Sequence, residues 1–111
     1  MQFLIIGLDG TDSEAPNRRS KFRDAHIKLG DELVASGNMW YGAAIVRDEG
    51  DMKGSMLMMD FSSEKELNKW LEKEPYMVGK VWQNLTIHKC RTREPWQFNR
   101  PREFFESRTR E

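Results

Sequence analysis

The chain has 111 residues, 38% of them hydrophobic, which suits one domain with a single core. Lysine plus arginine and aspartate plus glutamate both number 18, so the formal net charge is zero and lacks the basic excess of a nucleic-acid-binding protein. Cys90 is the single cysteine, and no apolar stretch approaches the roughly 18 residues of a membrane span. We therefore expect a cytoplasmic protein that binds neither nucleic acid nor membrane.

The first half of the chain predicts a strand followed by a helix. Residues 2–8 are an apolar run ended by turn residues, which is typical of a buried strand. Residues 10–17 have the composition of a loop and a helix start. A helix is predicted from about residue 18 to residue 36, where Gly37 suits its C-terminal cap. One face of this helix carries apolar residues and one histidine, namely Phe22, His26, Leu29 and Leu33.

The second half predicts a hairpin, a helix and a last strand. Residues 40–46 and 55–61 form the two strands of the hairpin, joined through a polar turn. Ser63 starts a capping box for a short amphipathic helix, which Pro75 stops. Residues 81–90 alternate in polarity and predict the fourth strand, with Trp82 facing away from Leu85 and Ile87.

The resulting β-α-β-β-α-β order indicates an α+β domain with the ferredoxin-like plait. Right-handed crossovers place both helices on one face of a four-stranded antiparallel sheet. The other face still carries methionine, leucine and tryptophan side chains, and an apolar face of that size is unusual in a monomer. We therefore expect a homodimer formed by sheet stacking or barrel formation.

His26 is the main candidate for chemistry, because it interrupts the apolar stripe of the first helix. An imidazole on such a stripe must find hydrogen-bond partners or face a cavity. Its ordinary pKa makes it a ready acid or base near neutral pH. The alternative interpretation is a partly buried histidine that is bonded to a backbone carbonyl and has no catalytic role.

Several charged residues are candidates to assist His26, either by orienting its imidazole or by binding a substrate. Glu74 could orient the imidazole or stabilise its protonated form, or it could be an exposed helix-end glutamate. Arg18, Arg19 and Arg23 lie one to two turns before His26. Guanidinium groups suit the carboxylate or phenolate of a small acidic substrate. The alternative, for at least two of the three, is a solvated basic face paired with local acids.

No metal or cofactor site is predicted. His26 and His88 lack the short fixed spacing of metal ligands. The segment 7–10 has neither the glycine spacing nor the lysine of a phosphate-binding loop. Cys90 has no neighbour in sequence that would activate its thiol. We therefore expect chemistry, if any, from side chains alone.

Residues 92–111 form a C-terminal tail outside the predicted domain of residues 1–91. The tail is rich in arginine and also holds Trp96, Phe98, Phe104 and Phe105. Aromatic and basic residues together can bind nucleic acid, but glutamates dilute the charge here. A freely solvated tail is usually poor in aromatics, so we expect it to dock on the domain or on the partner subunit.

The motifs resemble those of the YciI-like (YCII-related) proteins. Residues 23–27 (RDAHI), followed by Gly37, are similar to the R-x-x-H-L…G helix of that family. Glu74-Pro75-Tyr76 followed by Gly79 is similar to its D-P-[FY]…G segment, and the opening of the second helix at residues 62–64 also fits. The resemblance covers roughly residues 1–91 and implies a dimeric α+β barrel with ferredoxin-like subunits.

The resemblance also implies a pocket near the subunit interface with a histidine and an acid as a proton-transfer pair. Carried over by position, His26 and Glu74 would be catalytic, although Glu74 is one methylene longer than the family aspartate. Beside this pair, we expect Arg18, Arg23 and Tyr76 to bind substrate. One branch of the family removes chloride from a chlorinated hydroxyhydroquinone, and relatives of the fold act on lactones or aromatics. The alternative function is a non-catalytic ligand-binding or regulatory dimerisation module.

Overall fold

The computed structural model describes residues 1–109, which form an α+β fold. The elements in chain order are β1 (Gln2–Asp9), α1 (Ala15–Ser36), β2 (Met39–Val46), β3 (Met52–Asp60), α2 (Glu64–Lys73), α3 (Pro75–Val78), β4 (Trp82–Cys90), the 3-10 helix η1 (Pro95–Phe98) and α4 (Arg102–Thr109). The predicted β-α-β-β-α-β order is confirmed. Three helical segments were not predicted: α3 between α2 and β4, and η1 and α4 in the tail.

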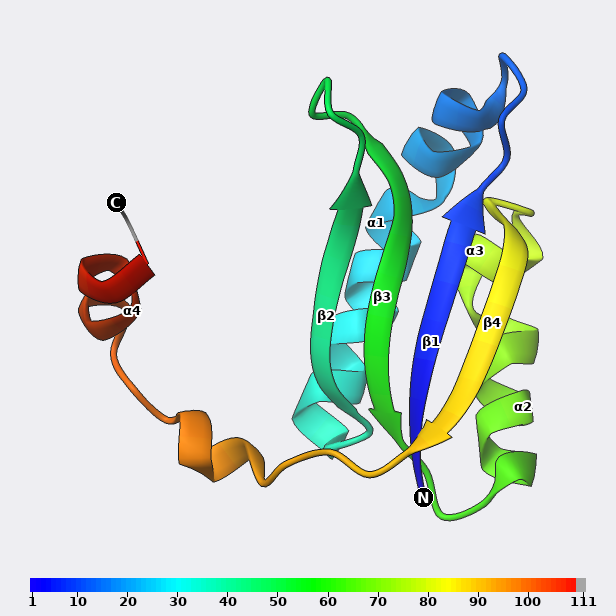
Figure 1. The fold of residues 1–111 in the computed structure, drawn as a ribbon. Helices are drawn as coiled ribbons and strands as arrows, with labels where there is room; N and C mark the ends of the chain where they lie inside the picture. The colour runs from blue at the N-terminus through cyan, green and yellow to red at the C-terminus, as the bar shows by residue number, and fades with distance from the viewer. Residues whose placement is uncertain (110–111) are drawn as a thin grey trace.

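The four strands form one antiparallel sheet in the order β2-β3-β1-β4, seen face-on in Figure 1. β1 is central, with Ile5 opposite Leu57 of β3 and Ile87 of β4. Burial alternates along β1, because Phe3 and Ile5 are buried whereas Leu4 and Ile6 are half-buried. This period of two assigns one face of the sheet to the core.

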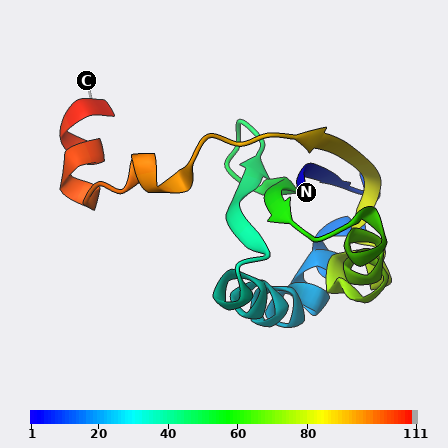
Figure 2. The ribbon, with the colours of Figure 1, turned by 90° about the horizontal axis from the view of Figure 1, so that it is seen from below.

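The helices α1, α2 and α3 all cover the same face of the sheet (Figures 1 and 2). Between them and the sheet lies the core, whose members include Phe3, Ile5, Leu57, Met59, Leu33, Leu67 and Trp70. Helices on one face of a four-stranded antiparallel sheet with this order form a ferredoxin-like plait. The predicted fold is therefore confirmed at the level of the single chain.

The helix ends follow the expected signals with two differences. Gly37 caps α1 in the left-handed conformation, with φ of 84°. α1 begins at Ala15, earlier than expected, because Pro16 is compatible with a first helical turn. Ser63 accepts the Glu66 amide at 3.2 Å, but the Glu66 side chain accepts Lys69 and leaves the capping box half formed. None of the helices in the described part of the chain has the length and apolar composition of a membrane span.

The register of β1 and β4 shifts between Leu8 and Asp9, and this irregularity changes the side on which Trp82 lies. Trp82 pairs with Asp9, is buried, and packs over Gly7 on the same side as Leu85. The expectation that Trp82 faces away from Leu85 is therefore wrong, because strict alternation does not survive a bulge. The indole is thereby placed next to the helices.

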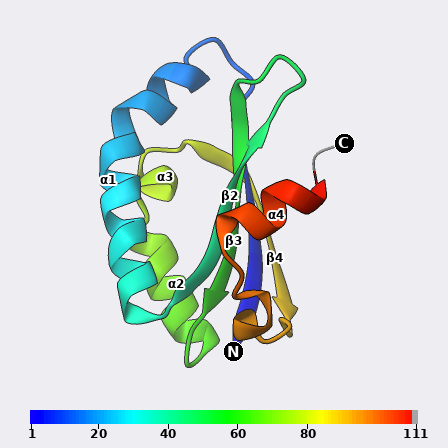
Figure 3. The ribbon, with the colours of Figure 1, turned by 90° about the vertical axis from the view of Figure 1, so that its left-hand side faces the viewer.

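The helices α1, α2 and α3 leave the opposite face of the sheet uncovered (Figure 2). The tail leaves β4 and runs past the β2 edge on this side of the sheet (Figure 3). Sheet and tail together border a groove of about 800 Å³ lined by Trp40, Tyr41, Met56, Met58, Thr92, Arg93, Pro95, Phe98 and Phe105. Trp96 and Phe98 are exposed at 67% and 55%. The tail therefore does not bury these two rings against its own domain.

Candidate functional site

His26 and Glu74 form a direct side-chain pair beneath α1. Nδ1 of His26 contacts Oε1 of Glu74, although 48 residues separate them in sequence. The Glu74 side chain is 1% exposed and the His26 side chain 15% exposed. Oε1 also accepts the Tyr76 amide, so it acts as an acceptor and Nδ1 as the donor. Nδ1 is therefore occupied by the carboxylate, which leaves Nε2 as the ring nitrogen available to a ligand.

The conformation of Glu74 follows from the proline after it. Pro75 has no amide hydrogen and cannot continue α2, so Glu74 adopts an extended ψ of 121°. Pro75 then starts α3, where its fixed φ suits the first turn. The Glu74 carboxylate turns back and accepts Trp70 Nε1 at 3.2 Å and the Tyr76 amide at 3.3 Å. With His26, three donors satisfy this buried acid.

Two aromatic rings fix the plane of the imidazole. Tyr76 stacks on His26 with ring centroids 3.8 Å apart. Trp82 meets both rings edge-on, at 5.8 Å from His26 and 5.6 Å from Tyr76. The Trp82 indole is itself anchored, because its Nε1 donates to Ser55 Oγ at 3.3 Å. These contacts leave His26 little freedom to rotate.

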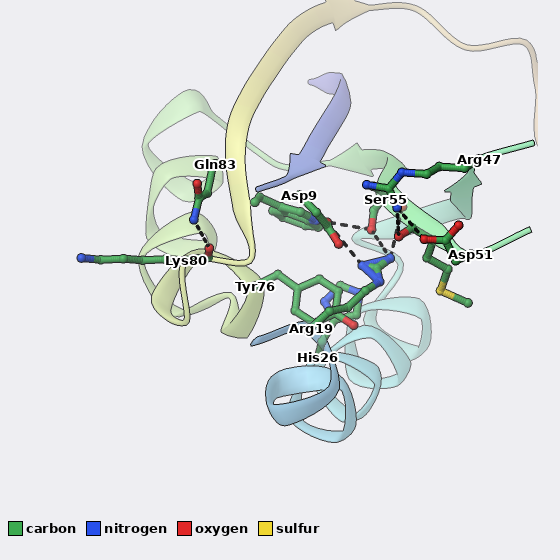
Figure 4. Close-up of polar contacts among 12 residues, drawn as sticks. Asp9, Arg19, His26, Arg47, Asp51, Ser55, Tyr76, Lys80 and Gln83 are labelled. Carbon is green, nitrogen blue, oxygen red and sulfur yellow. Dashed lines mark hydrogen bonds and ion pairs between the residues drawn. The ribbon is translucent and has the colours of Figure 1, made fainter. Parts of the chain in front are cut away.

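Arg19 lies beside Tyr76 and Asp9 in the site (Figure 4). Its NH2 group donates to the Gly54 carbonyl at 3.1 Å and to Ser55 Oγ at 3.4 Å. Its guanidinium also lies 4.9 Å from the centre of the Tyr76 ring and 3.6 Å from Asp9. Burial raises the pKa of the Asp9 carboxyl and of the Tyr76 hydroxyl, and Arg19 opposes both shifts.

A cleft of about 290 Å³ opens between α1 and the β2–β3 half of the sheet. Its polar residues include Arg19, Arg23, His26, Ser55 and Tyr76, and its apolar residues include Ile27, Val34, Met39, Leu57 and Met52. A mostly apolar cleft with a few convergent polar groups is the usual form of a small-molecule site. The imidazole of His26 is therefore accessible from the cleft, whereas Glu74 supports it from behind.

The structure brings together most of the residues singled out from the sequence. Arg23 and Tyr76 line the cleft with His26. Arg18 does not, because its guanidinium binds Asp12, with NH1 donating to Oδ2 at 2.8 Å. This hydrogen bond holds the pKa of Asp12 at about 2, well below its ordinary value. Arg18 therefore stabilises the loop before α1 by binding Asp12 and does not contribute to the cleft.

Arg19 is the cleft arginine that the sequence-based choice of substrate-binding residues left out. It precedes His26 by seven residues, which is close to two helical turns, so the two side chains share a face. Arg18 precedes His26 by eight residues and points away from that face. Spacing alone could have found Arg19, whereas Asp9 and Ser55 come from distant strands and carry no sequence signal for this site.

His88 and Cys90 lie away from the cleft. His88 is exposed and pairs in register with Leu4, on the sheet face opposite the helices and His26. Cys90 is half-buried with Sγ 3.5 Å from Met58 Sδ. Over residues 1–109, no group of three or more histidine, cysteine or acidic side chains is placed to hold a metal ion. The two histidines of the sequence therefore do not form one site.

The comparison with protein families assigns the chain to a family. The model of the YCII-related domain matches residues 1–91. The chain belongs to the YCII-related domain family. The match ends one residue after β4, so the helices of the tail lie beyond the part that the YCII-related domain defines. No curated protein matches the sequence.

Two solved structures are similar to this YCII-related domain, to very different degrees. One is the 5-chloro-2-hydroxyhydroquinone dehydrochlorinase TftG of Burkholderia phenoliruptrix AC1100, in complex with 2,5-dihydroxybenzoquinone. It is 23% identical, with a TM-score of 0.71 over 82% of this chain and 94% of TftG. A hypothetical protein of Pyrococcus horikoshii, PHS023, is 8% identical with a TM-score of 0.45 over 82% and 93% of the two chains. The likeness to TftG supports the ferredoxin-like plait.

Proposed function

We propose that this YCII-related domain is an enzyme that moves a proton on a small ring compound, with His26 as general acid and base and Glu74 as its orienting partner. The observation that carries the proposal is the direct contact of His26 Nδ1 with a buried carboxylate, while the same ring lines a cleft. With Nδ1 bound, Nε2 is the nitrogen left to exchange a proton with substrate. Glu74 would stabilise the imidazolium that forms when Nε2 takes a proton.

The size and lining of the cleft favour a single substituted ring as substrate. A volume of about 290 Å³ lies at the small end of ligand pockets. Apolar walls suit the faces of a ring, and Arg23 and Tyr76 suit its oxygen substituents. TftG is a dehydrochlorinase for a chlorinated hydroxyhydroquinone, which supports aromatic, lactone or halogenated rings as the class to test. Arg18, held by Asp12, is left out of this proposal.

Chloride release from 5-chloro-2-hydroxyhydroquinone tests the function. We expect His26→Gln to lower the rate about 100-fold or more, since general acid–base catalysis contributes on that scale. Lys28→Gln is the control, because Lys28 is exposed on the same helix and does not line the cleft, and its rate should equal that of the wild type. Equal rates for both variants would refute the role of His26. A protein that binds ring compounds but returns all of them unchanged would be the ligand-binding module instead.

We also propose that the protein is a homodimer, with the uncovered sheet face and the tail as its interface. The groove of about 800 Å³ between them is lined mostly by apolar side chains, and exposed apolar side chains grouped in this way are typical of interaction sites. A second copy would fill the groove and cover Trp96 and Phe98, both of which are exposed here. A dimeric α+β barrel would follow from stacking of the two sheets.

Analytical ultracentrifugation of the full chain tests the dimer. We expect a dimer at micromolar concentration and weaker association after Trp96→Ser with Phe98→Ser. Val78→Ser is the control, because Val78 is 60% exposed on α3, away from the tail. A wild-type protein that sediments as a monomer would contradict the dimer. Unchanged association of the double variant would remove the tail from the interface.

A further inference from the structure

Two arginines stand one helical turn apart on the wall of the cleft. Arg19 and Arg23 are separated by four residues of α1, so their side chains emerge on one face. Both line the cleft together with His26. Among the described residues that line it, Asp31 is the one acid, and it is a further two turns along the helix from Arg23. The polar end of the cleft is therefore positively charged.

Arg19 has more donors than the protein uses. The residue is 9% exposed, and its NH2 group donates to Gly54 and Ser55. Its Nε and NH1 atoms are buried and have no hydrogen-bond partner in the described part of the chain. A buried guanidinium with unused donors is costly, because water no longer solvates it. An acceptor that entered from the cleft would relieve this cost.

Asp9 compensates the charge of Arg19 only in part. Its Oδ1 lies 3.6 Å from Arg19 NH1, beyond hydrogen-bonding distance, and makes no hydrogen bond within residues 1–109. Burial raises the pKa of this carboxyl, because water solvates its negative charge less well there. Because no hydrogen bond joins the two groups, Asp9 neutralises the positive charge of Arg19 incompletely, and an anionic ligand in the cleft could still be attracted to it.

Arg23 is exposed and makes no side-chain hydrogen bond or ion pair to any residue from 1 to 109. Arg23 and Tyr76 line the same cleft, and the positive charge of Arg23 lowers the pKa of the Tyr76 hydroxyl against the effect of burial. The two arginines thus approach Tyr76 from different depths, with Arg19 at the buried end and Arg23 at the solvent end.

We propose that Arg19 and Arg23 together bind a negatively charged, phenolate-type oxygen on a single-ring substrate. The cleft would thereby bind the anionic form of such a ring in preference to a neutral one. The inference rests on the proposed function in taking the cleft as the substrate site. The ring would lie along the apolar wall, with its charged oxygen near Tyr76 and within reach of His26. Arg19 and Arg23 are then binding residues, and the neutral form of the same ring would be rejected.

Calorimetric titration with 2,5-dihydroxybenzoquinone, whose hydroxyls ionise readily, tests the inference. We expect Arg23→Gln and Arg19→Gln each to weaken binding about tenfold or more, as a lost charge-assisted hydrogen bond does. Arg18→Gln is the matched control: it is the same substitution one residue away, on a side chain held by Asp12, and should leave the affinity unchanged. The neutral 2,5-dimethoxybenzoquinone should bind weakly to all variants alike. Arg19→Lys, which keeps the charge and loses the fork, should restore part of the affinity.

The possible outcomes separate this oxyanion site from the proposed function. Equal affinities of Arg23→Gln and the control, equal binding of the charged and neutral rings, or no binding by the wild type would overturn it. Arg23 is exposed, so its variant remains a decisive test even where Arg19→Gln does not fold. If binding does not depend on the arginines but turnover still depends on His26, the proposed enzyme function is retained and the oxyanion site is refuted. If binding depends on the arginines but no turnover occurs, the oxyanion site is retained and the enzyme function is refuted.

Discussion

The ring of Tyr76 lies flat on the imidazole of His26, with 3.8 Å between the centroids and 7° between the planes. Tyr76 follows Glu74 by two residues, so one short turn supplies both the carboxylate at the edge of the imidazole and the ring on its face. The position of His26 therefore depends on the local conformation of this turn as much as on α1.

Substitution of Glu74 should separate orientation from folding. Glu74→Gln keeps one oxygen, which can still accept the Tyr76 amide, but it sets an amide NH2 group against Trp70 Nε1 and removes the negative charge beside His26, so we expect activity to fall about tenfold to 100-fold. Glu74→Ala strands three donors and should also lower the free energy of unfolding by about 3 kcal/mol. Nitrogen NMR of the imidazole gives the tautomer directly, with Nδ1 protonated in the wild type. A proton on Nε2 in the neutral wild-type ring would contradict the assigned pair.

The length of the Glu74 side chain is a second variable. Glu74→Asp shortens the reach by one methylene, so the carboxylate is expected to lose contact with His26 while keeping its charge. Activity should fall between those of the wild type and Glu74→Gln, with thermal unfolding measured on the same samples as the control for folding. Full activity of Glu74→Asp would show that the exact reach of the acid has no importance here.

Asp12 should stabilise the fold in a defined range of pH. Arg18 lowers the folded-state pKa of Asp12 from 3.8 to about 2, so the folded protein holds this proton less tightly than the unfolded chain. The contribution is complete above pH 3.8 and is lost as the pH falls toward about 2. Urea unfolding of the wild type and Asp12→Asn should differ at pH 7 and converge near pH 2. A constant difference would exclude this linkage.

Asp9 should have the opposite effect. Burial raises its folded-state pKa above 3.8, so the ionised carboxylate costs stability at neutral pH. Asp9→Asn is expected to increase the free energy of unfolding at pH 7. The gain should shrink as the pH falls through the raised pKa and disappear below pH 3.8, where the wild-type acid is protonated in both states. A variant less stable than the wild type at pH 7 would mean that attraction to Arg19 outweighs burial.

Gly7 should tolerate no side chain. A Cβ at this position would lie 2.5 Å from the Trp82 indole, so Gly7→Ala must displace the ring that holds His26 and Tyr76 edge-on. We expect a loss of about 1–3 kcal/mol in the free energy of unfolding, as for other overpacked cores, and a changed near-ultraviolet signal. Gly30→Ala is the control, because its nearest contact would be 3.8 Å away. Equal stabilities of the two variants would contradict this packing.

The sequence predicted the regular elements because their signals are local. Apolar alternation, Gly37 and Ser63 each act within a few residues, and all three lie where the structure has strands and helix ends. Trp82 was assigned to the wrong face because the bulge that moves it depends on the pairing of two strands. Asp9 and Ser55 were missed because they reach the site only through the sheet.

The His26–Glu74 pair could be predicted only in part. The helical stripe predicted that His26 points inward, and the resemblance to the family suggested its partner. That a glutamate can reach Nδ1 follows from the extended ψ before Pro75, which turns the carboxylate back. Arg18 was preferred over Arg19 although the two-turn spacing favours Arg19.

Glu74 is the C-terminal cap of one helix, the N-terminal cap of the next and the partner of the His26 imidazole. The ends of the two helices and the position of the imidazole therefore depend on one side chain. Any fluctuation that unwinds α3 withdraws the carboxylate from His26 at the same moment. The free energy for opening one turn therefore sets the fraction of molecules with an assembled proton-transfer pair. Hydrogen exchange at the Tyr76 amide, which donates to this carboxylate, would report that fraction without any substrate.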